Sequence, residues 1–331
     1  MNFAHFPKVE LHLHLDCSLS YAVVSQIDPS ITLETYNSEF IAPAKCENLL
    51  DYLSRAPSSF PLMKTHQQLH LVVLDVFKQL QKDNVIYAEI RFAPLLHSEG
   101  ELTPHEVVSS VEAAVAEAVH STGIEARIIL CTLRYYSQAQ SLETVKLVEN
   151  FLGTYVAAFD IAADKPGNVI DEHVAAFTYA HQNGIPFTAH VGETRGIQNF
   201  WDTLEAFAPK RVGHGVCSIE DPVLLDRIIG ENIHLEACPT CNVQTDCYET
   251  YADHPIDRLY RAGISVSVNT DTRTISNITL NDEYQKLHDT FGWEKEHFYR
   301  CNVNALKAAF IPDEVREPLL EKLAAGYTQK S

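Results

Sequence analysis

Eight short apolar runs, separated by longer segments with helical periodicity, constrain the fold of this sequence most strongly. Strands that alternate with helices are typical of parallel β/α units. The strand candidates are residues 9–15, 85–92, 126–133, 156–161, 185–190, 211–212, 233–237 and 264–269. Because eight parallel strands close a TIM barrel, we predict an α/β fold of the (β/α)8 barrel class.

The segments between these runs predict the helices and two additions to the barrel. Apolar residues at three-to-four spacing predict helices over 65–82 and 104–121, and Asn183-Gly184 predicts the end of a helix over 171–183. The long segment 17–63, between the first strand and its helix, is expected to form a lid over the barrel mouth. The chain after about Phe291 is expected to form extra helices.

A doubly wound open sheet is the alternative fold. It is disfavoured because no glycine-rich phosphate loop follows the first strand. No repeat, low-complexity tract or linker interrupts the sequence, so we expect residues 1–331 to form a single barrel domain.

Charge and composition exclude several classes of protein. With 25 basic and 44 acidic side chains the net charge is −19, which disfavours binding to nucleic acid or to anionic membranes. No stretch reaches the roughly 20 apolar residues of a membrane span, and the N-terminus lacks a secretory signal. The eight cysteines are scattered, as in reduced proteins, so we expect a cytoplasmic protein with buried thiols.

Strict alternation in the first strand candidate points to a metal. Glu10, His12, His14 and Asp16 share one face, and apolar residues occupy the other. In a barrel the polar face points inward, where unpaired charge is costly. Histidines at i and i+2 can reach one ion. A hydrogen-bonded polar strand without metal is the alternative.

Three more polar clusters follow later strands. His190 and Glu193 end the fifth strand candidate, His214 the sixth and Asp271 the eighth. The carboxyl ends of barrel strands are where TIM-barrel active sites are built. Three histidines and one aspartate around an open position suit a catalytic zinc, and the remaining Glu193 and His214 could then move protons.

Two other patterns carry less weight. Cys238 and Cys241 have metal-site spacing, but a second such pair is absent. His234 and Glu236 precede them as in cytidine-type zinc deaminases, but both halves of that signature adjoin on one strand here, so we reject it.

Tyr87, Glu89 and Arg91 share a face of the second strand candidate. They predict either a Glu–Arg pair that supports the barrel floor or a substrate contact. The acidic runs at 143–149 and 314–321 are interpreted as solvated helix faces.

Taken together, the motifs resemble those of the adenosine deaminase family, zinc enzymes of the amidohydrolase superfamily. They are HxHLD at 12–16, HVGE at 190–193, GHG at 213–215, CPTxN at 238–242 and NTD at 269–271. They occur in the family's order, and the resemblance extends over nearly the whole chain, from PKVE at 7–10 to NALK at 304–307.

The resemblance implies a reaction and a set of roles. One Zn²⁺ per chain would be held by His12, His14, His190 and Asp271. Glu193 would protonate the purine at N1, and His214 and Asp271 would orient the attacking water. Attack at C6 would convert adenosine or 2′-deoxyadenosine to inosine or 2′-deoxyinosine and release ammonia.

The resemblance also implies substrate contacts, with three departures. His14 and Asp16 would bind substrate, with Asp16 accepting a hydrogen bond from the ribose 5′-hydroxyl. Cys17 replaces the usual glycine after Asp16, and Ala163 stands where a glycine normally offers its N–H to N3. Thr272 replaces an aspartate that contacts N7, and its hydroxyl can still donate there.

Several alternatives stay open. The substrate could be another 6-aminopurine, such as adenine, aminodeoxyfutalosine or another 5′-modified adenosine, or the chain could be a catalytically inactive nucleoside-binding member of the family. A phosphoesterase with two or three metals is disfavoured because the fourth strand candidate lacks a lysine. Neither a monomer nor a weak homo-oligomer is excluded, and the ligand types also suit cobalt or iron.

Overall fold

Eight parallel strands form the centre of the computed structural model, which describes residues 3–98, 100–164, 170–194 and 196–328. The strands are β1 (Lys8–His14), β2 (Val85–Phe92), β3 (Glu125–Leu133), β4 (Val156–Ala162), β5 (His190–Val191), β6 (Arg211–His214), β7 (His234–Ala237) and β8 (Val266–Val268). They pair in chain order as two four-stranded parallel sheets, β1 to β4 and β5 to β8.

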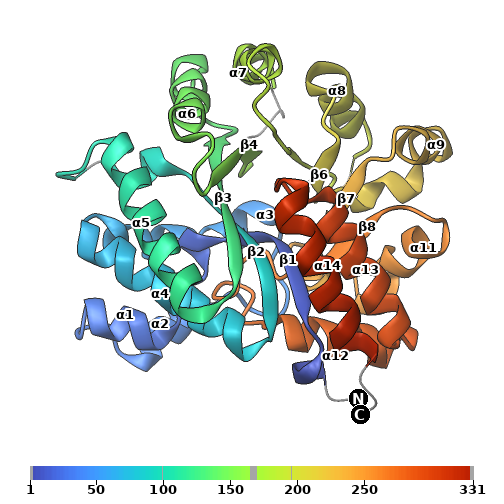
Figure 1. Ribbon diagram of the computed structural model, residues 1–331, viewed down its shortest axis with the longest axis horizontal. Helices are drawn as coiled ribbons and strands as arrows, with labels where there is room; N and C mark the ends of the chain where they lie inside the picture. Colours follow the sequence, from blue (N-terminus) through green and yellow to red (C-terminus); the bar gives the residue numbers. More distant parts are fainter. Residues whose placement is uncertain (1–2, 99, 165–169, 195, 329–331) are drawn as a thin grey trace.

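Single bridges join the two sheets at both seams. Phe159 of β4 pairs with Phe187, and the Thr188 N–H donates to the Phe159 carbonyl at 3.0 Å. Leu13 of β1 pairs with Asp271, and the His14 N–H donates to the Asp271 carbonyl at 2.7 Å. The strands thus form a ring surrounded by helices (Figure 1), which confirms the predicted barrel class.

The helices that follow the strands surround this ring (Figure 1). They are α4 (His66–Lys82), α5 (Pro104–Thr122), α6 (Gln138–Phe151), α7 (Asp171–Gln182), α8 (Gln198–Phe207), α9 (Pro222–Gly230), α10 (Pro239–Gln244) and α11 (Ile256–Arg261). Capping boxes at Thr65 and Thr103 start α4 and α5 one residue after each threonine. The helices predicted over 65–82, 104–121 and 171–183 form within one residue of their predicted ends.

The segment expected to form a lid folds into short helices. They are α1 (Tyr21–Ile27), α2 (Leu33–Glu39), α3 (Leu49–Leu53) and the 3₁₀ turns Ala56–Ser58 and Phe60–Met63. Backbone hydrogen bonds tie it to the segments that follow β8 and β7, from Ala42 N to the Ile275 carbonyl and from Cys46 N to the carbonyl of Gln244 at the end of α10. The segment therefore lies at the carboxyl ends of the strands.

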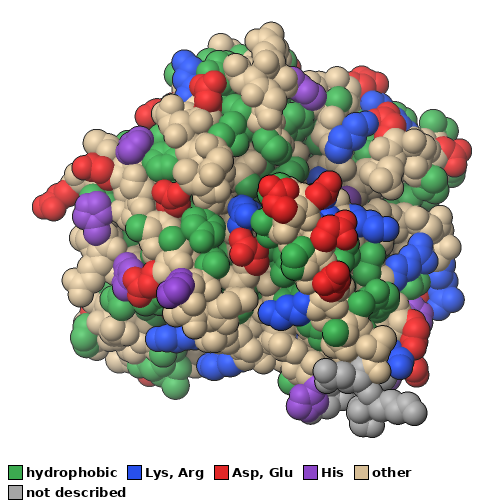
Figure 2. All heavy atoms as spheres, in the orientation of Figure 1, with side chains coloured by type: hydrophobic (Ala, Val, Ile, Leu, Met, Phe, Trp, Pro, Cys, Tyr) green, Lys and Arg blue, Asp and Glu red, His purple; other side chains and the backbone are tan. Residues whose placement is uncertain are grey.

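Three helices complete the chain: α12 (Leu280–Phe291), α13 (Lys295–Ala308) and α14 (Asp313–Thr328). The end of α14 packs on the start of the chain, where the rings of Phe6 and Tyr327 stack with centroids 4.9 Å apart. Acidic side chains gather on the outer face of α14 (Figure 2), as expected for a solvated helix face; they are Asp313, Glu314, Glu317 and Glu321.

The sequence overestimates two strands. The apolar run 185–190 forms a paired strand only at its end, because Pro186 has no N–H to donate and Phe187 makes only an isolated bridge. The run 264–269 is paired only over Val266–Val268. All eight cysteines are buried and unbridged, as expected. No described helix is long and apolar enough to cross a membrane.

Candidate active site

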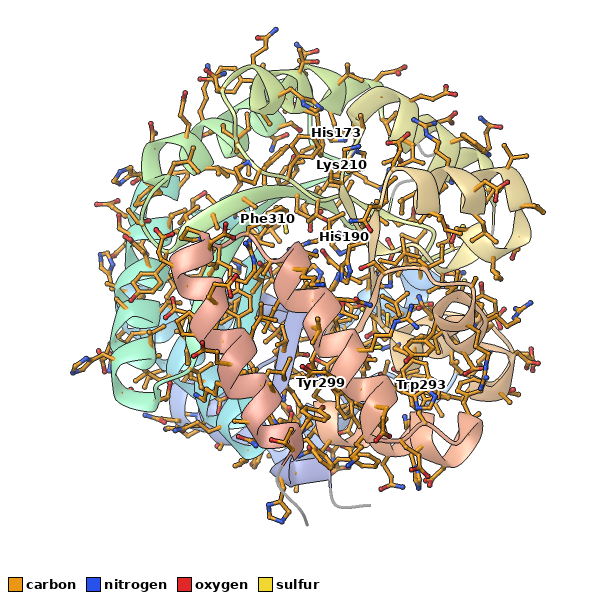
Figure 3. All side chains as sticks on the ribbon, turned by 45° about the vertical axis from the view of Figure 1, so that its right-hand side comes forward. His173, His190, Lys210, Trp293, Tyr299 and Phe310 are labelled. Atoms are coloured by element: carbon orange, nitrogen blue, oxygen red, sulfur yellow. The ribbon has the colours of Figure 1, made fainter. Side chains whose placement is uncertain are left out.

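Three histidine rings and one carboxylate meet at the carboxyl ends of β1, β5 and β8. The Nε2 atoms of His14 and His190 are 3.1 Å apart. Asp271 Oδ1 lies 3.4 Å from Nε2 of His12 and 3.5 Å from Nε2 of His14. His190 lies inside the barrel, behind α13 and α14 (Figure 3). The strand alternation thus brings together four of the residues predicted from the sequence.

This cluster fits a metal cation. Two overlapping groups of potential ligand atoms, each within 4.8 Å, share His12: one adds His14 and His190, the other His214, Cys238 and Asp271. The buried Nε2 of His12 has no hydrogen-bond partner among the described residues. Ligands about 2.0–2.2 Å from a tetrahedral ion lie about 3.3–3.6 Å apart, which matches the two distances to Asp271. Imidazole nitrogens and a carboxylate suit Zn²⁺.

Two buried carboxylates hold the histidine rings from behind. His12 Nδ1 lies 2.7 Å from Glu236 Oε2, and His190 Nδ1 lies 3.2 Å from Asp160 Oδ1. Arg91 joins both carboxylates, 2.7 Å from Asp160 and 2.6 Å from Glu236. Such partners fix the tautomer and direct each Nε2 toward the shared centre. Asp160 and Glu236 had no predicted role, because a carboxylate in a strand does not reveal which side chains it meets inside the barrel.

The ionic network continues toward the barrel floor. Arg211 pairs with both Glu236 and Glu89, and its guanidinium stacks 3.9 Å from the ring centroid of Phe310. Although burial raises the pKa of Glu236, the charges of Arg211 and Arg91 lower it to about 2.

Two sequence interpretations need correction here. Glu89 pairs with Arg211 and not with Arg91, so the expected pair is wrong although its place in the barrel interior is right. Glu10, which shares the inward face of the first strand in sequence, does not join the histidines. It pairs with Arg273 at 2.6 Å and accepts from the Thr270 N–H at 3.0 Å.

Glu193 and His214 lie beside the cluster. His214 Nε2 is 3.4 Å from Glu193 Oε2 and 3.9 Å from Asp271 Oδ2. Burial raises the pKa of Glu193 to about 7, reinforced by the Asp271 charge and opposed by His190. Burial lowers the pKa of His214 to about 4, so its ring is neutral at pH 7. Asn242 donates to Nδ1 of this ring at 3.2 Å, which leaves the ring proton on Nε2, facing the two carboxylates.

Three site residues have left-handed backbone conformations. The φ angles are +65° at Ala163, +58° at His214 and +65° at Asp271. Non-glycine residues adopt this region at a cost of about 1–2 kcal/mol each. Such strain is concentrated at functional sites. Ala163 therefore keeps the conformation that a glycine would adopt freely at this position.

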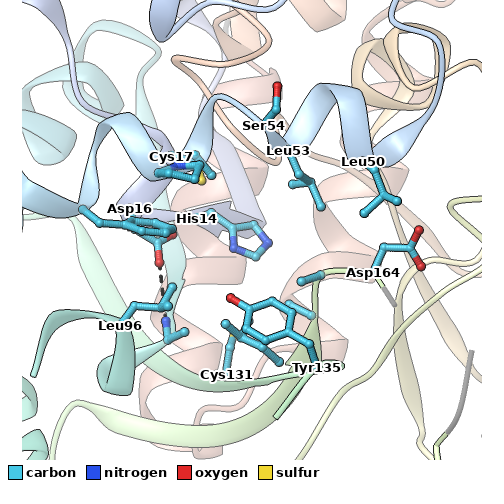
Figure 4. Close-up of a pocket in the computed structure, with 17 residues that line it drawn as sticks. His14, Asp16, Cys17, Leu50, Leu53, Ser54, Leu96, Cys131, Tyr135 and Asp164 are labelled. Atoms are coloured by element: carbon cyan, nitrogen blue, oxygen red, sulfur yellow. Dashed lines mark hydrogen bonds between the residues drawn. The ribbon is translucent and has the colours of Figure 1, made fainter. Parts of the chain in front are cut away.

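A cavity of about 290 Å³ opens next to the cluster (Figure 4). His14 and Asp16 lie at its base, and its walls are largely apolar, with Leu50, Leu53, Leu96 and Tyr135 among them. The Asp16 carboxylate accepts from the Ala93 N–H at 3.5 Å and lies 3.6 Å from His97 Nε2. Burial opposes ionisation of Asp16, but His97 and His14 lower its pKa overall.

A smaller cavity of about 40 Å³ leads from there to the cluster. Its lining includes Glu193, Asp271, Ala163 and Thr272, together with Tyr52 from α3. Every residue predicted to contact substrate therefore lines one of two adjoining cavities. Tyr52 was not foreseen, since the sequence gives no signal that ties the lid to Thr272.

The sequence matches the adenosine deaminase family over residues 7–326. An adenosine deaminase of Clostridium perfringens strain 13 is 32% identical over 326 residues, covering 96% of this chain and 98% of that protein. An adenosine deaminase of Lacticaseibacillus paracasei is 34% identical over 329 residues, covering 97% of this chain and 96% of that protein.

Solved structures share the fold at lower identity. Adenine deaminase from Arthrobacter aurescens superposes with a TM-score of 0.88 at 21% identity, covering 96% of this chain and 98% of that chain. Arabidopsis ADAL in complex with IMP gives a TM-score of 0.88 at 20% identity, covering 99% of both chains. An amidohydrolase from Burkholderia ambifaria with bound Zn gives 0.85 at 20% identity, covering 98% of this chain and 93% of that chain.

Proposed function

Because this chain belongs to the adenosine deaminase family of hydrolytic deaminases, we propose that it converts adenosine and 2′-deoxyadenosine to inosine and 2′-deoxyinosine with release of ammonia. The observation that carries the proposal is the meeting of a histidine–aspartate cluster with Glu193 and His214 at the mouth of one barrel. Curated relatives named adenosine deaminase, about one third identical over nearly the full length, support this substrate.

The proposed cofactor is one Zn²⁺ per chain. Its ligands would be His12, His14, His190 and Asp271, whose atoms lie at the separations described above. When bound, zinc supplies Lewis acidity that makes water a nucleophile near neutral pH. Burial lowers the pKa of His14 to about 4, and this keeps its imidazole neutral and able to bind metal.

Glu193 is the proposed proton donor to purine N1. A general acid works best with a pKa near the operating pH, and Glu193 has a pKa of about 7 because it is buried. His214 directs an N–H toward Asp271 and Glu193, a position from which it would orient the attacking water. These two groups and Asp271 form the proposed catalytic set.

Four residues would bind the nucleoside. Asp16, ionised and held by Ala93 N–H, would accept a hydrogen bond from the 5′-hydroxyl, with His14 beside it. Ala163 would offer its backbone N–H to N3, a direction preserved by its left-handed conformation. Thr272 would donate to N7 from the wall of the inner cavity.

The experiment that tests this function is ultraviolet spectrophotometry of the purified protein. The substrates are adenosine, 2′-deoxyadenosine, adenine, AMP and 5′-modified adenosines, each measured before and after metal removal and after zinc is restored. Rapid turnover of adenosine that depends on metal is the expected result. Turnover of only adenine or a 5′-modified nucleoside would support the proposed deamination and contradict adenosine as the substrate. Binding of adenosine by the zinc-loaded protein without turnover of any substrate would identify an inactive nucleoside-binding member.

A further inference from the structure

Three hydroxyl groups meet where the lid contacts the end of β8. Tyr52 is fully buried although it belongs to the short lid helix α3, and its hydroxyl lies 2.6 Å from Ser276 Oγ. The same hydroxyl makes a short hydrogen bond with Thr272 Oγ1, and Thr272 and Ser276 lie 3.4 Å apart. Side chains 220 positions apart in sequence are therefore joined at the wall of the inner cavity.

The protons of these three hydroxyl groups determine which hydrogen bonds the cluster can donate to a ligand. Each hydroxyl has one proton to donate and can accept two hydrogen bonds. A phenol is the stronger donor and an aliphatic hydroxyl the stronger acceptor, so the preferred direction is from Tyr52 to Thr272. The proton of Thr272 is then free to point into the cavity, because among the described residues its hydroxyl contacts only Tyr52 and Ser276.

The proposed orientation of the purine decides which of its atoms would meet this proton. Glu193 and Thr272 both line the inner cavity, together with His14, His190 and Asp271, three of the residues that would hold the metal. In a 6-aminopurine, N1 and N7 flank C6, and both are acceptors. If N1 faces Glu193 with C6 toward the cluster, N7 lies on the other side of C6, where Thr272 would donate under the proposed function.

We propose that Tyr52 is a positioning residue that holds the Thr272 hydroxyl as a hydrogen-bond donor to N7 of the bound purine. The inference rests on the proposed function, which supplies the purine and its orientation. It also makes recognition of the base depend on the position of the lid, because Leu49 and Leu53 of the same helix line the inner cavity. The aspartate usual in the family at position 272 is then replaced by two residues acting together.

The test pairs one substitution with one change of substrate. Tyr52→Phe removes only the phenolic hydroxyl, and 7-deazaadenosine lacks only the N7 acceptor. A single neutral hydrogen bond is worth a factor of about 3 to 10 in affinity. We expect kcat/KM for adenosine to fall by about that factor in Tyr52→Phe, while kcat/KM for 7-deazaadenosine stays within about twofold. Thr272→Val should lower kcat/KM for adenosine in the same way. Adding Tyr52→Phe to Thr272→Val should then have no further effect.

A second measurement reports ligand binding separately from the deamination step. Competitive inhibition by inosine and by 7-deazainosine reports binding of the product alone, and Tyr52→Phe should weaken only inosine. Thr272→Val in the same assay should also weaken only inosine, and equal binding of both products by this variant would overturn the proposal even if Tyr52→Phe does not fold. Tyr36→Phe is the matched control, because its buried hydroxyl donates to the Leu19 carbonyl at 2.8 Å and lines neither cavity. It should leave the ratio of the two substrates unchanged.

The outcomes separate this inference from the proposed function. If the unaltered protein deaminates adenosine and Tyr52→Phe lowers kcat/KM equally for both substrates, the proposed role of Tyr52 is overturned and the proposed function stands. If the unaltered protein turns over neither nucleoside and binds neither product, the proposed function fails first. Selective loss for the ligands that contain N7 supports both.

Discussion

Asp160→Asn is the substitution whose consequences the structure specifies most fully. Asparagine has nearly the same shape as aspartate, so the change removes charge and leaves volume unaltered. Asp160 is fully buried, accepts from Arg91 Nη1 at 2.7 Å and lies 3.2 Å from His190 Nδ1. Its pKa is lowered, since His190 and Arg91 outweigh the opposing effect of burial, so the carboxylate is ionised.

Two losses follow. Breaking a buried ion pair by removing one partner costs about 3–5 kcal/mol. Arg91 keeps Glu236 and the Leu11 carbonyl, both at 2.6 Å, so we expect the lower end, a fall of about 3 kcal/mol in the free energy of unfolding. Loss of the partner that orients a ligating histidine typically reduces metal affinity by about 10–100-fold.

Urea unfolding of the metal-free protein measures the first loss, and zinc competition with a chromophoric chelator measures the second. The control is Glu283→Gln, because Glu283 is equally buried and accepts from Tyr251 and the Thr240 N–H, none of which is a proposed ligand. Glu283→Gln should leave zinc affinity unchanged. An Asp160→Asn protein that unfolds within about 1 kcal/mol of the parent and binds zinc equally well would refute the role given to this network.

Three further predictions address the acid, the interior and the packing around a ligand. Glu193→Gln should lower kcat by about 10²–10⁴-fold with zinc content unchanged, as measured by steady-state kinetics and metal analysis; unchanged kcat would contradict the role of Glu193. His234 has its pKa lowered to about 3 by burial and Arg211. Only the unfolded chain therefore gains this proton between pH 6.5 and 3. The free energy of unfolding should decrease as the pH is lowered through this range, by up to about 1.4 kcal/mol per pH unit. Urea unfolding of His234→Gln should show a smaller dependence of this free energy on pH. In Gly213→Ala the new Cβ would lie 2.8 Å from His12 Cε1, so the displaced ring should bind zinc more weakly in the chelator assay, and unchanged affinity would contradict this geometry.

Local patterns in the sequence predicted the elements whose cause is itself local. The period of two in β1 placed His12 and His14 on one face, and the three-to-four apolar spacing over 104–121 located α5. The strand-end motifs were located correctly because parallel strands in a barrel all end at the same side. The fifth strand was overestimated because hydrophobicity does not register the missing N–H of Pro186.

The supporting partners could not be predicted in the same way. Which carboxylate lies behind His12 depends on how β1 faces β7 inside the barrel, although these strands are not paired and the two residues are 224 positions apart in sequence. The same is true of Arg91, whose face was predicted but whose partners were not. Tyr52 lies in a short helix whose path over the barrel no periodicity describes. Contacts of this kind depend on closure of the ring.

The stacking of Phe6 on Tyr327 makes the described polypeptide almost a closed loop. The turn at Gly123, between α5 and β3, lies at the opposite end of the barrel from the proposed site. A circular permutant with a short linker between the old ends and new ends at Gly123 would keep every neighbour around the ring. The order of the motifs from His12 to Asp271 would change along the chain but not in space. The order of the motifs along the chain therefore depends on where the chain ends lie, and the proposed chemistry depends only on the arrangement of the strands around the barrel.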